Sequence, residues 1–97
     1  DDVVQANFLA ATRDVSPGTV LNVAGGSHTS VNEVLQIFED LAGSSLSVTR
    51  VKAIAGDVNR TGGDTTAIRS VLGWSPSVAL REGIARQFAW AADLAKL

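Results

Sequence analysis

Side chains that could do chemistry are few in this chain of 97 residues. His28 is its single histidine, and cysteine is absent. One histidine without a second ligand argues against a metal site, and the absence of thiols excludes disulfides and thiolate metal centres. We therefore interpret His28 as an exposed loop residue.

A glycine pair precedes a helix start and could cradle an anion. Gly25 and Gly26 lie just before Ser30, where free backbone N–H groups gather. Ser30 and Glu33, however, have the spacing of a capping box, which uses those donors itself. The sequence therefore favours a tight turn over an anion site here.

Hydrophobic periodicity predicts the helices that position these residues. They cover residues 2–12, 31–42, 65–72 and about 80 to the end. Asp2 with Gln5 is the expected capping pair of the first helix, and Asp64 is the expected cap of the third. Gly43 and Gly73 are placed as left-handed stops.

Two runs rich in apolar and β-branched residues predict strands, at 19–23 and 46–51. The first looks buried on both faces apart from Asn22, as in an interior strand of a parallel sheet. The order is then helix, strand, helix, strand, short helix, helix, which indicates an α/β fold. Two strands are too few for a self-sufficient sheet, so the first needs neighbours that these residues do not supply.

The two tryptophans could serve packing or ligand binding. Trp74 could stack on a base, but Gly73 and Pro76 beside it favour an anchor that packs the short helix against the last one. Trp90 and Phe88 fall at helical spacing and are expected in the core or at an interface.

Composition limits the class of protein. The net charge is −2 with both signs scattered, so nucleic acid is not an expected partner. The longest apolar run is far too short to span a bilayer, so no membrane is expected either. The length suits one small domain over residues 1–97. The lack of cysteine fits a cytoplasmic location. Because the chain opens inside a helix cap at Asp1, we expect an excised fragment.

A series of short motifs then follows in the order of one family. In chain order these are DDVV at 1–4, LNVAGG at 21–26, TSVNE at 29–33, GDV at 56–58, DTTA at 64–67, LGWSP at 72–76 and LREGI at 80–84. The ordered set resembles the C-terminal, substrate-binding part of the NAD-dependent epimerase/dehydratases. These are extended short-chain dehydrogenases such as UDP-glucose 4-epimerase, dTDP-glucose 4,6-dehydratase and UDP-glucuronate decarboxylase.

The resemblance implies a division of labour along a longer protein. In that family an N-terminal Rossmann domain binds NAD, the smaller C-terminal domain binds the nucleoside diphosphate of the sugar, and a Tyr–Lys pair with Ser or Thr catalyses the reaction. This sequence has no tyrosine and no Gly-x-x-Gly-x-x-Gly fingerprint. The expected fold is therefore a fragment without the Rossmann half, which is its missing partner. Alone it should bind no cofactor and be inactive.

Asp57 is the candidate substrate residue. In the resembled family the aspartate of an Arg-x-Gly-Asp motif contacts the ribose, because a carboxylate can accept hydrogen bonds from both ribose hydroxyls. The alternative interpretation of Asp57 is a loop aspartate that caps or turns the chain. The motif arginine pairs with the diphosphate, and here Ile54 replaces it. Arg60 and Lys52 could substitute. Arg60 is the better candidate of the two because it lies just past Asp57, although the sequence favours a solvated surface charge at this position.

Three functions are therefore open. The first is the C-terminal part of a nucleotide-sugar epimerase or dehydratase, which contributes to binding a nucleoside-diphosphate sugar. The second is a stand-alone interaction or dimerisation domain, with a homodimer as its expected product. The third is a non-catalytic regulatory relative of the family, and its only support is the isoleucine at position 54 in place of the expected arginine.

Overall fold

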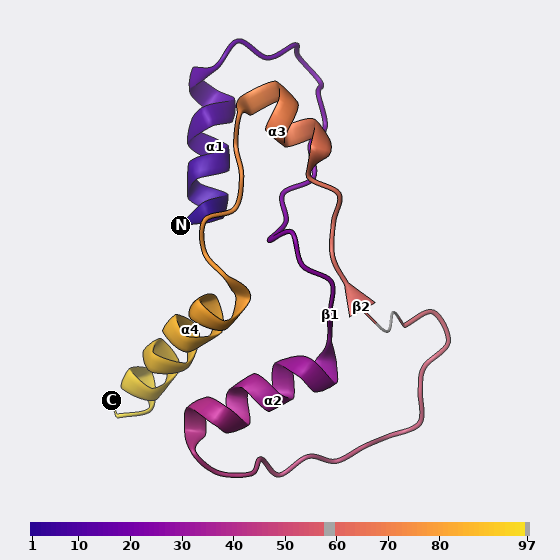
Figure 1. Ribbon diagram of the computed structural model, residues 1–97, viewed down its shortest axis with the longest axis vertical. Helices are drawn as coiled ribbons and strands as arrows, with labels where there is room; N and C mark the ends of the chain where they lie inside the picture. The colour runs from indigo at the N-terminus through magenta and orange to yellow at the C-terminus, as the bar shows by residue number, and fades with distance from the viewer. Residues whose placement is uncertain (58–59, 97) are drawn as a thin grey trace. The chain divides into compact units, whose positions relative to one another are not determined.

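The computed structural model describes residues 1–57 and 60–96, with the side chains of residues 60 and 61 outside that description. The elements in chain order are α1 (Asp2–Thr12), β1 (Thr29–Ser30), α2 (Val31–Ala42), β2 (Arg60–Thr61), α3 (Thr66–Leu72) and α4 (Leu80–Ala95), as Figure 1 shows. The strands β1 and β2 pair antiparallel, with Thr29 opposite Thr61 and Ser30 opposite Arg60.

The predicted helices are confirmed because their signals are local. Ser30 Oγ accepts from the Glu33 N–H at 3.2 Å, and Glu33 Oε2 accepts from the Ser30 N–H at 2.8 Å, which completes the capping box of α2. Helices α2 and α3 end at Gly43 and Gly73, both in the left-handed region. Asp64 Oδ1 accepts from the Thr66 N–H at 2.9 Å, so it supports the start of α3 from one residue before the N-cap.

The predicted strands at 19–23 and 46–51 are wrong for this structure. Neither segment belongs to a ladder, and Val20 and Val51 are 89% and 81% exposed. A strand of β-branched residues is stable only beside another strand, and the described part of the chain offers these segments none. The two-residue strands β1 and β2 were not predicted, because two residues carry no periodicity.

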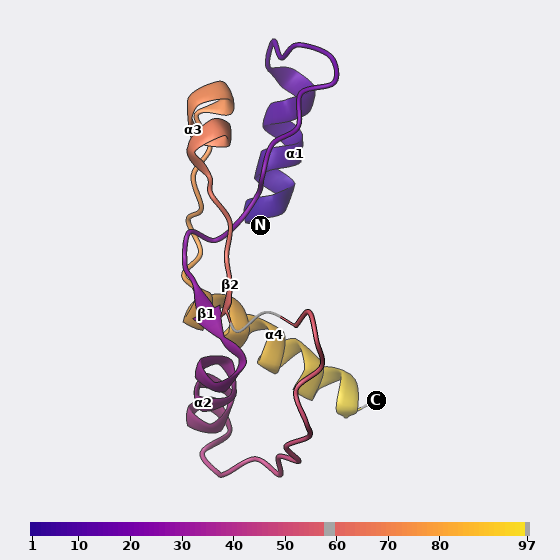
Figure 2. The same cartoon turned by 90° about the vertical axis from the view of Figure 1, so that its right-hand side faces the viewer.

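The chain forms two compact units, one of residues 1–28 and 62–79 and the other of residues 29–61 and 80–97. In the first unit α1 and α3 lie side by side (Figures 1 and 2). Their shared core is buried and consists of Ala6, Ile68, Leu72 and Trp74. Trp74 is thus the anchor that the sequence predicts for α3, and within this unit it packs α3 against α1. The expected packing against the last helix stays a prediction.

Asp2 does not cap α1 as predicted. It lies inside the helix, and its carboxylate accepts from the Ser77 N–H at 3.0 Å, the Ser77 hydroxyl at 2.8 Å and the Val78 N–H at 3.0 Å. Those hydrogen bonds lower the pKa of Asp2 below its usual value, and the bond from the Val78 N–H has the largest effect. The Trp74 Nε1–H also donates to the Asp2 carbonyl at 3.0 Å. Asp2 therefore fastens α1 to the segment after α3.

The second unit is built on α2 and α4. Phe38 and Phe88 meet with ring centroids 6.3 Å apart, and Arg81 Nη1 pairs with Asp40 Oδ2 at 3.2 Å. Ile84 is buried. Trp90 is 63% exposed, so the expectation of a core position is wrong for it, while an interface position stays a prediction. No helix in the described part of the chain is long and apolar enough to cross a membrane.

Candidate functional site

The Gly-Asp motif lies on a tight turn in the loop that joins α2 to β2. The Asp57 N–H donates to the Ile54 carbonyl at 3.2 Å, and Gly56, between them, has a φ of +94°. A positive φ at the third position of a turn favours glycine. A Cβ at Gly56 would meet no atom within 4 Å, so the backbone conformation and not space requires glycine there.

The turn leaves the Asp57 side chain uncommitted. Asp57 is exposed, and its carboxylate accepts no hydrogen bond from the described residues. The turn itself is closed by backbone atoms. Among the described residues, the Asp57 carboxylate therefore neither caps nor turns the chain. Its two oxygens are available to a ligand.

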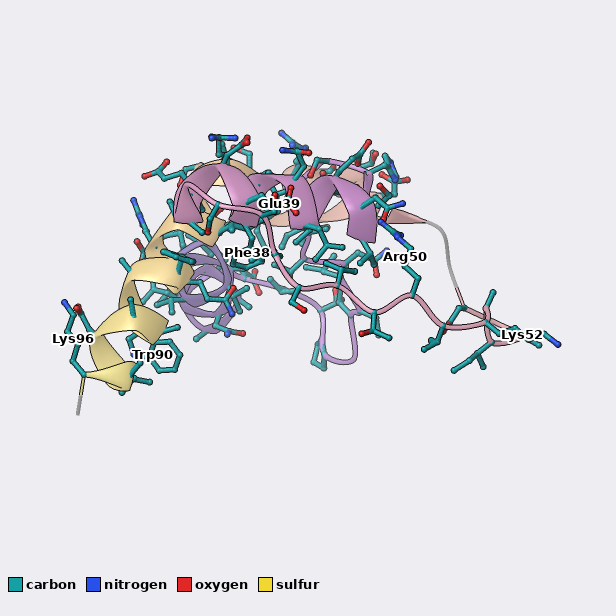
Figure 3. All side chains as sticks on the ribbon, turned by 90° about the horizontal axis from the view of Figure 1, so that it is seen from below. Phe38, Glu39, Arg50, Lys52, Trp90 and Lys96 are labelled. Atoms are coloured by element: carbon teal, nitrogen blue, oxygen red, sulfur yellow. The ribbon has the colours of Figure 1, made fainter. Side chains whose placement is uncertain are left out.

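The other residues singled out in this loop have different surroundings. Ile54, at the position of the expected arginine, is 70% exposed. The backbone of Arg60 lies in β2 opposite Ser30, while its side chain falls outside the described residues. Lys52 is exposed, and Figure 3 shows it pointing away from α2.

A cleft of about 500 Å³ opens in the second unit between the start of α2 and the same loop. Polar residues line it on both sides, Ser30 and Asn32 on one and Thr49 and Arg50 on the other. Arg50 Nη1 donates to Asn32 Oδ1 at 2.9 Å, and Figure 3 shows Arg50 pointing toward α2. Asp57 does not line this cleft.

Sequence reasoning missed Arg50. Arg50 lies within the predicted 46–51 strand and was given no role there, and the search for a substitute cation considered only Lys52 and Arg60. Its contact joins residues 18 positions apart, which no short-range pattern reveals. A useful signal would have been its position four residues before Ile54, on the same loop as Asp57.

His28 is an exposed residue, as predicted, in the turn that begins at Gly26 with a φ of +79°. It lies against Gly62, where an added Cβ would collide with its ring. An added Cβ at Gly63 would come within 2.9 Å of the Ala24 side chain. Gly62 and Gly63 therefore allow two segments of the first unit that are distant in sequence to approach closely.

The chain is similar to known nucleotide-sugar epimerases, although no protein-family model matches it. The sequence is 38% identical over 86 residues to UDP-glucose 4-epimerase of Mycolicibacterium smegmatis, covering 89% of this chain and 27% of that protein. It is 25% identical over 103 residues to UDP-glucuronate 4-epimerase of Thermodesulfobacterium geofontis, covering 95% and 32%. The solved structure of MoeE5 in complex with UDP-glucuronic acid and NAD matches 95% of this chain and 31% of its own, with a TM-score of 0.87 and 38% identity.

The chain is similar over most of its length to a part of these UDP-sugar epimerases. The family resemblance drawn from the short motifs is thereby confirmed, as is the fold class of an α/β fragment of an extended short-chain dehydrogenase. The chain spans about a third or less of the length of these relatives, with 27% to 32% covered.

Proposed function

We propose that these residues form part of the binding region for a nucleoside-diphosphate sugar in a cytoplasmic epimerase or dehydratase, with Asp57 accepting hydrogen bonds from the ribose. The observation that carries the proposal is the 54–57 turn. It holds Asp57 at the position of the family motif with an exposed, uncommitted carboxylate. The names of the three relatives cited above, two UDP-sugar epimerases and a complex with UDP-glucuronic acid, support the ligand class.

The chemistry of Asp57 suits a vicinal diol. An ionised carboxylate has two acceptor oxygens, one for each ribose hydroxyl, and hydrogen bonds to a charged group contribute about 1.5–3 kcal/mol. The positive φ of Gly56 fixes the turn from which the carboxylate projects. The residue's role is therefore to bind and orient, and no proton needs to move at Asp57.

We assign no catalytic step to this chain. NAD, when bound in such an enzyme, supplies transient oxidation at the sugar. The residues present do not fit that cofactor, because the sequence has neither the glycine fingerprint that holds a dinucleotide nor a tyrosine. In our proposal, NAD and the catalytic residues belong to a Rossmann domain that partners this region.

Titration calorimetry with UDP, dTDP and GDP sugars tests the proposal on the protein at its native length. Asp57→Ala should weaken binding of the preferred nucleotide sugar roughly tenfold or more, because one charge-assisted contact is lost. Asp14→Ala is the matched control, since Asp14 is an exposed acid in the other unit. Equal affinities of the two variants would refute the ribose assignment.

Arg60 is a candidate phosphate contact in this proposal. Arg60 pairs with Ser30 in the β1–β2 ladder, and Ser30 lines the cleft. The backbone of Arg60 therefore lies next to a residue of the cleft wall. Removal of a cation that binds phosphate should weaken binding of a nucleoside diphosphate and spare the nucleoside. Arg60→Ala is therefore carried through the experiment below.

A second candidate function is dimerisation through α4. Trp90 and Leu94 are 63% and 46% exposed near the end of that helix, and large apolar side chains in such positions favour an interface. In this proposal the occupant is a second copy of the chain. Light scattering should then give twice the monomer mass for the wild type and the monomer mass for Trp90→Ala, whereas a wild-type monomer at high concentration would refute it.

A further inference from the structure

The cleft in the second unit has the size and composition of a small-molecule site. Its volume of about 500 Å³ lies within the range of roughly 300–1,000 Å³ that is usual for such sites. Val31 and Leu35 supply apolar wall from α2, and Val48 and Val51 supply it from the loop. The polar residues that line it are Ser30, Asn32, Thr49 and Arg50. A cleft that joins apolar walls to polar and charged residues suits a ligand that carries a charged end.

Arg50 brings an uncompensated positive charge to this cleft. Its partner, Asn32, is a neutral amide, which orients the guanidinium without neutralising it. Among the residues that the structure describes, no carboxylate forms an ion pair with Arg50. The bond to Asn32 uses one of five N–H donors, so most of the planar fork is left for an anion.

Two other sources of positive potential near the cleft, the capped N–H groups of α2 and Lys52, are already used or turned away. The capping box occupies the backbone N–H groups of Ser30 and Glu33 at the start of α2. Lys52 has the same charge as Arg50 and lies two residues further along the loop, but it does not line the cleft and points away from α2. Arg50 is therefore the cation that the described residues present to a ligand in the cleft.

We propose that Arg50, oriented by Asn32, binds the diphosphate of the nucleotide sugar in this cleft. The inference rests on the proposed function and names the group that would neutralise the phosphates. A guanidinium can donate two parallel N–H bonds to phosphate oxygens, and the hydroxyls of Ser30 and Thr49 can donate to the remaining ones. It also accounts for an aliphatic residue at position 54, because the positive charge comes from four residues earlier in the same loop.

The test compares UDP with uridine and inorganic pyrophosphate on the protein at its native length, by calorimetry for UDP and by NMR titration for the weaker ligands. Arg50→Ala should weaken UDP binding roughly ten- to a hundredfold and leave uridine binding unchanged. Arg50→Lys should recover part of the loss, because it keeps the charge without the planar fork. Lys52→Ala is the matched control and should bind UDP as the wild type does.

The possible results separate this inference from the proposed function. If the wild type binds UDP and Arg50→Ala has the same affinity for UDP as Lys52→Ala, Arg50 is not the phosphate contact, while the proposed function stands. The same conclusion follows if Arg60→Ala is the only variant that weakens UDP binding. Equal weakening of UDP and uridine in Arg50→Ala would show that Arg50 acts on the fold, which overturns the inference. A wild type that binds neither UDP nor any of the UDP, dTDP and GDP sugars refutes both proposals. A wild type that binds only pyrophosphate assigns the cleft to a free anion and overturns the nucleotide assignment.

Discussion

Replacing Trp74 with alanine removes the side chain that joins α1 to α3. Trp74 is 2% exposed, packs with Ala6, Ile68 and Leu72, and donates its indole N–H to the Asp2 carbonyl at 3.0 Å. Truncation of a buried tryptophan costs about 3–5 kcal/mol, partly through the cavity that it leaves. Trp74→Phe keeps much of the ring but leaves the Asp2 carbonyl without that donor, so it should cost about 1–3 kcal/mol.

Amide hydrogen exchange measures this loss locally, which suits a protein with two compact units. In Trp74→Ala the slowest amides of α1 and α3 should exchange roughly 100- to 3,000-fold faster, because each 1.4 kcal/mol of opening free energy is a factor of ten. Amides of α2, which contributes nothing to this cluster, provide the internal reference.

Trp90→Ala is the matched control, because it is the same substitution at a side chain that is 63% exposed. It should change exchange rates by only a small factor, as exposed substitutions usually do. The reasoning from burial would be refuted if Trp90→Ala accelerated exchange in α1 and α3 as much as Trp74→Ala did. A wild-type rate in Trp74→Phe would show that the indole hydrogen bond contributes little.

Two further predictions concern the same unit. The pKa of Asp2 is lowered from 3.8, so its contribution to stability is fully present above about pH 3.8 and is lost as the pH falls through the lower value of the folded state. Protection of the Val78 amide should fall in that window in the wild type but be low and independent of pH in Asp2→Asn; a wild-type pH profile in the variant would contradict this. Gly63→Ala should cost about 1–3 kcal/mol in thermal unfolding, because its Cβ would lie 2.9 Å from that of Ala24. Gly25→Ala meets nothing within 4 Å at an ordinary φ and should be nearly neutral, so equal melting temperatures for these two variants would reject the steric argument.

The parts of the fold that the sequence predicts are those decided within a few residues. The capping box of Ser30 and Glu33 spans three positions, and the stops at Gly43 and Gly73 depend on the backbone freedom of one residue each. Such features form wherever the pattern occurs. The same reasoning failed for Asp2, whose partners lie 75 and 76 residues away, because an aspartate at a helix start fits a local cap equally well.

Strands depend on more than their own residues. The run at 19–23 has the composition of a buried strand, yet Val20 is 89% exposed because no described segment pairs with it. β-propensity measures how well side chains fit a pleated, half-buried surface, and it creates no strand where that surface is lacking. The composition of residues 19–23 therefore predicts a neighbouring strand. Val20 is exposed because the described residues do not supply one.

The candidate site combines two contacts that depend on different parts of one loop. The direction of the Asp57 carboxylate is set by the backbone turn and the positive φ of Gly56, neither of which needs a particular side chain at position 54. Ile54 is 70% exposed, so its replacement of an arginine has not drawn the turn into a new packing arrangement. Loss of the positive charge at that position thus leaves the proposed ribose contact intact and leaves the phosphates to another cation. Because Arg50 is oriented by Asn32, outside the turn, the proposed ribose and phosphate contacts should fail separately under mutation.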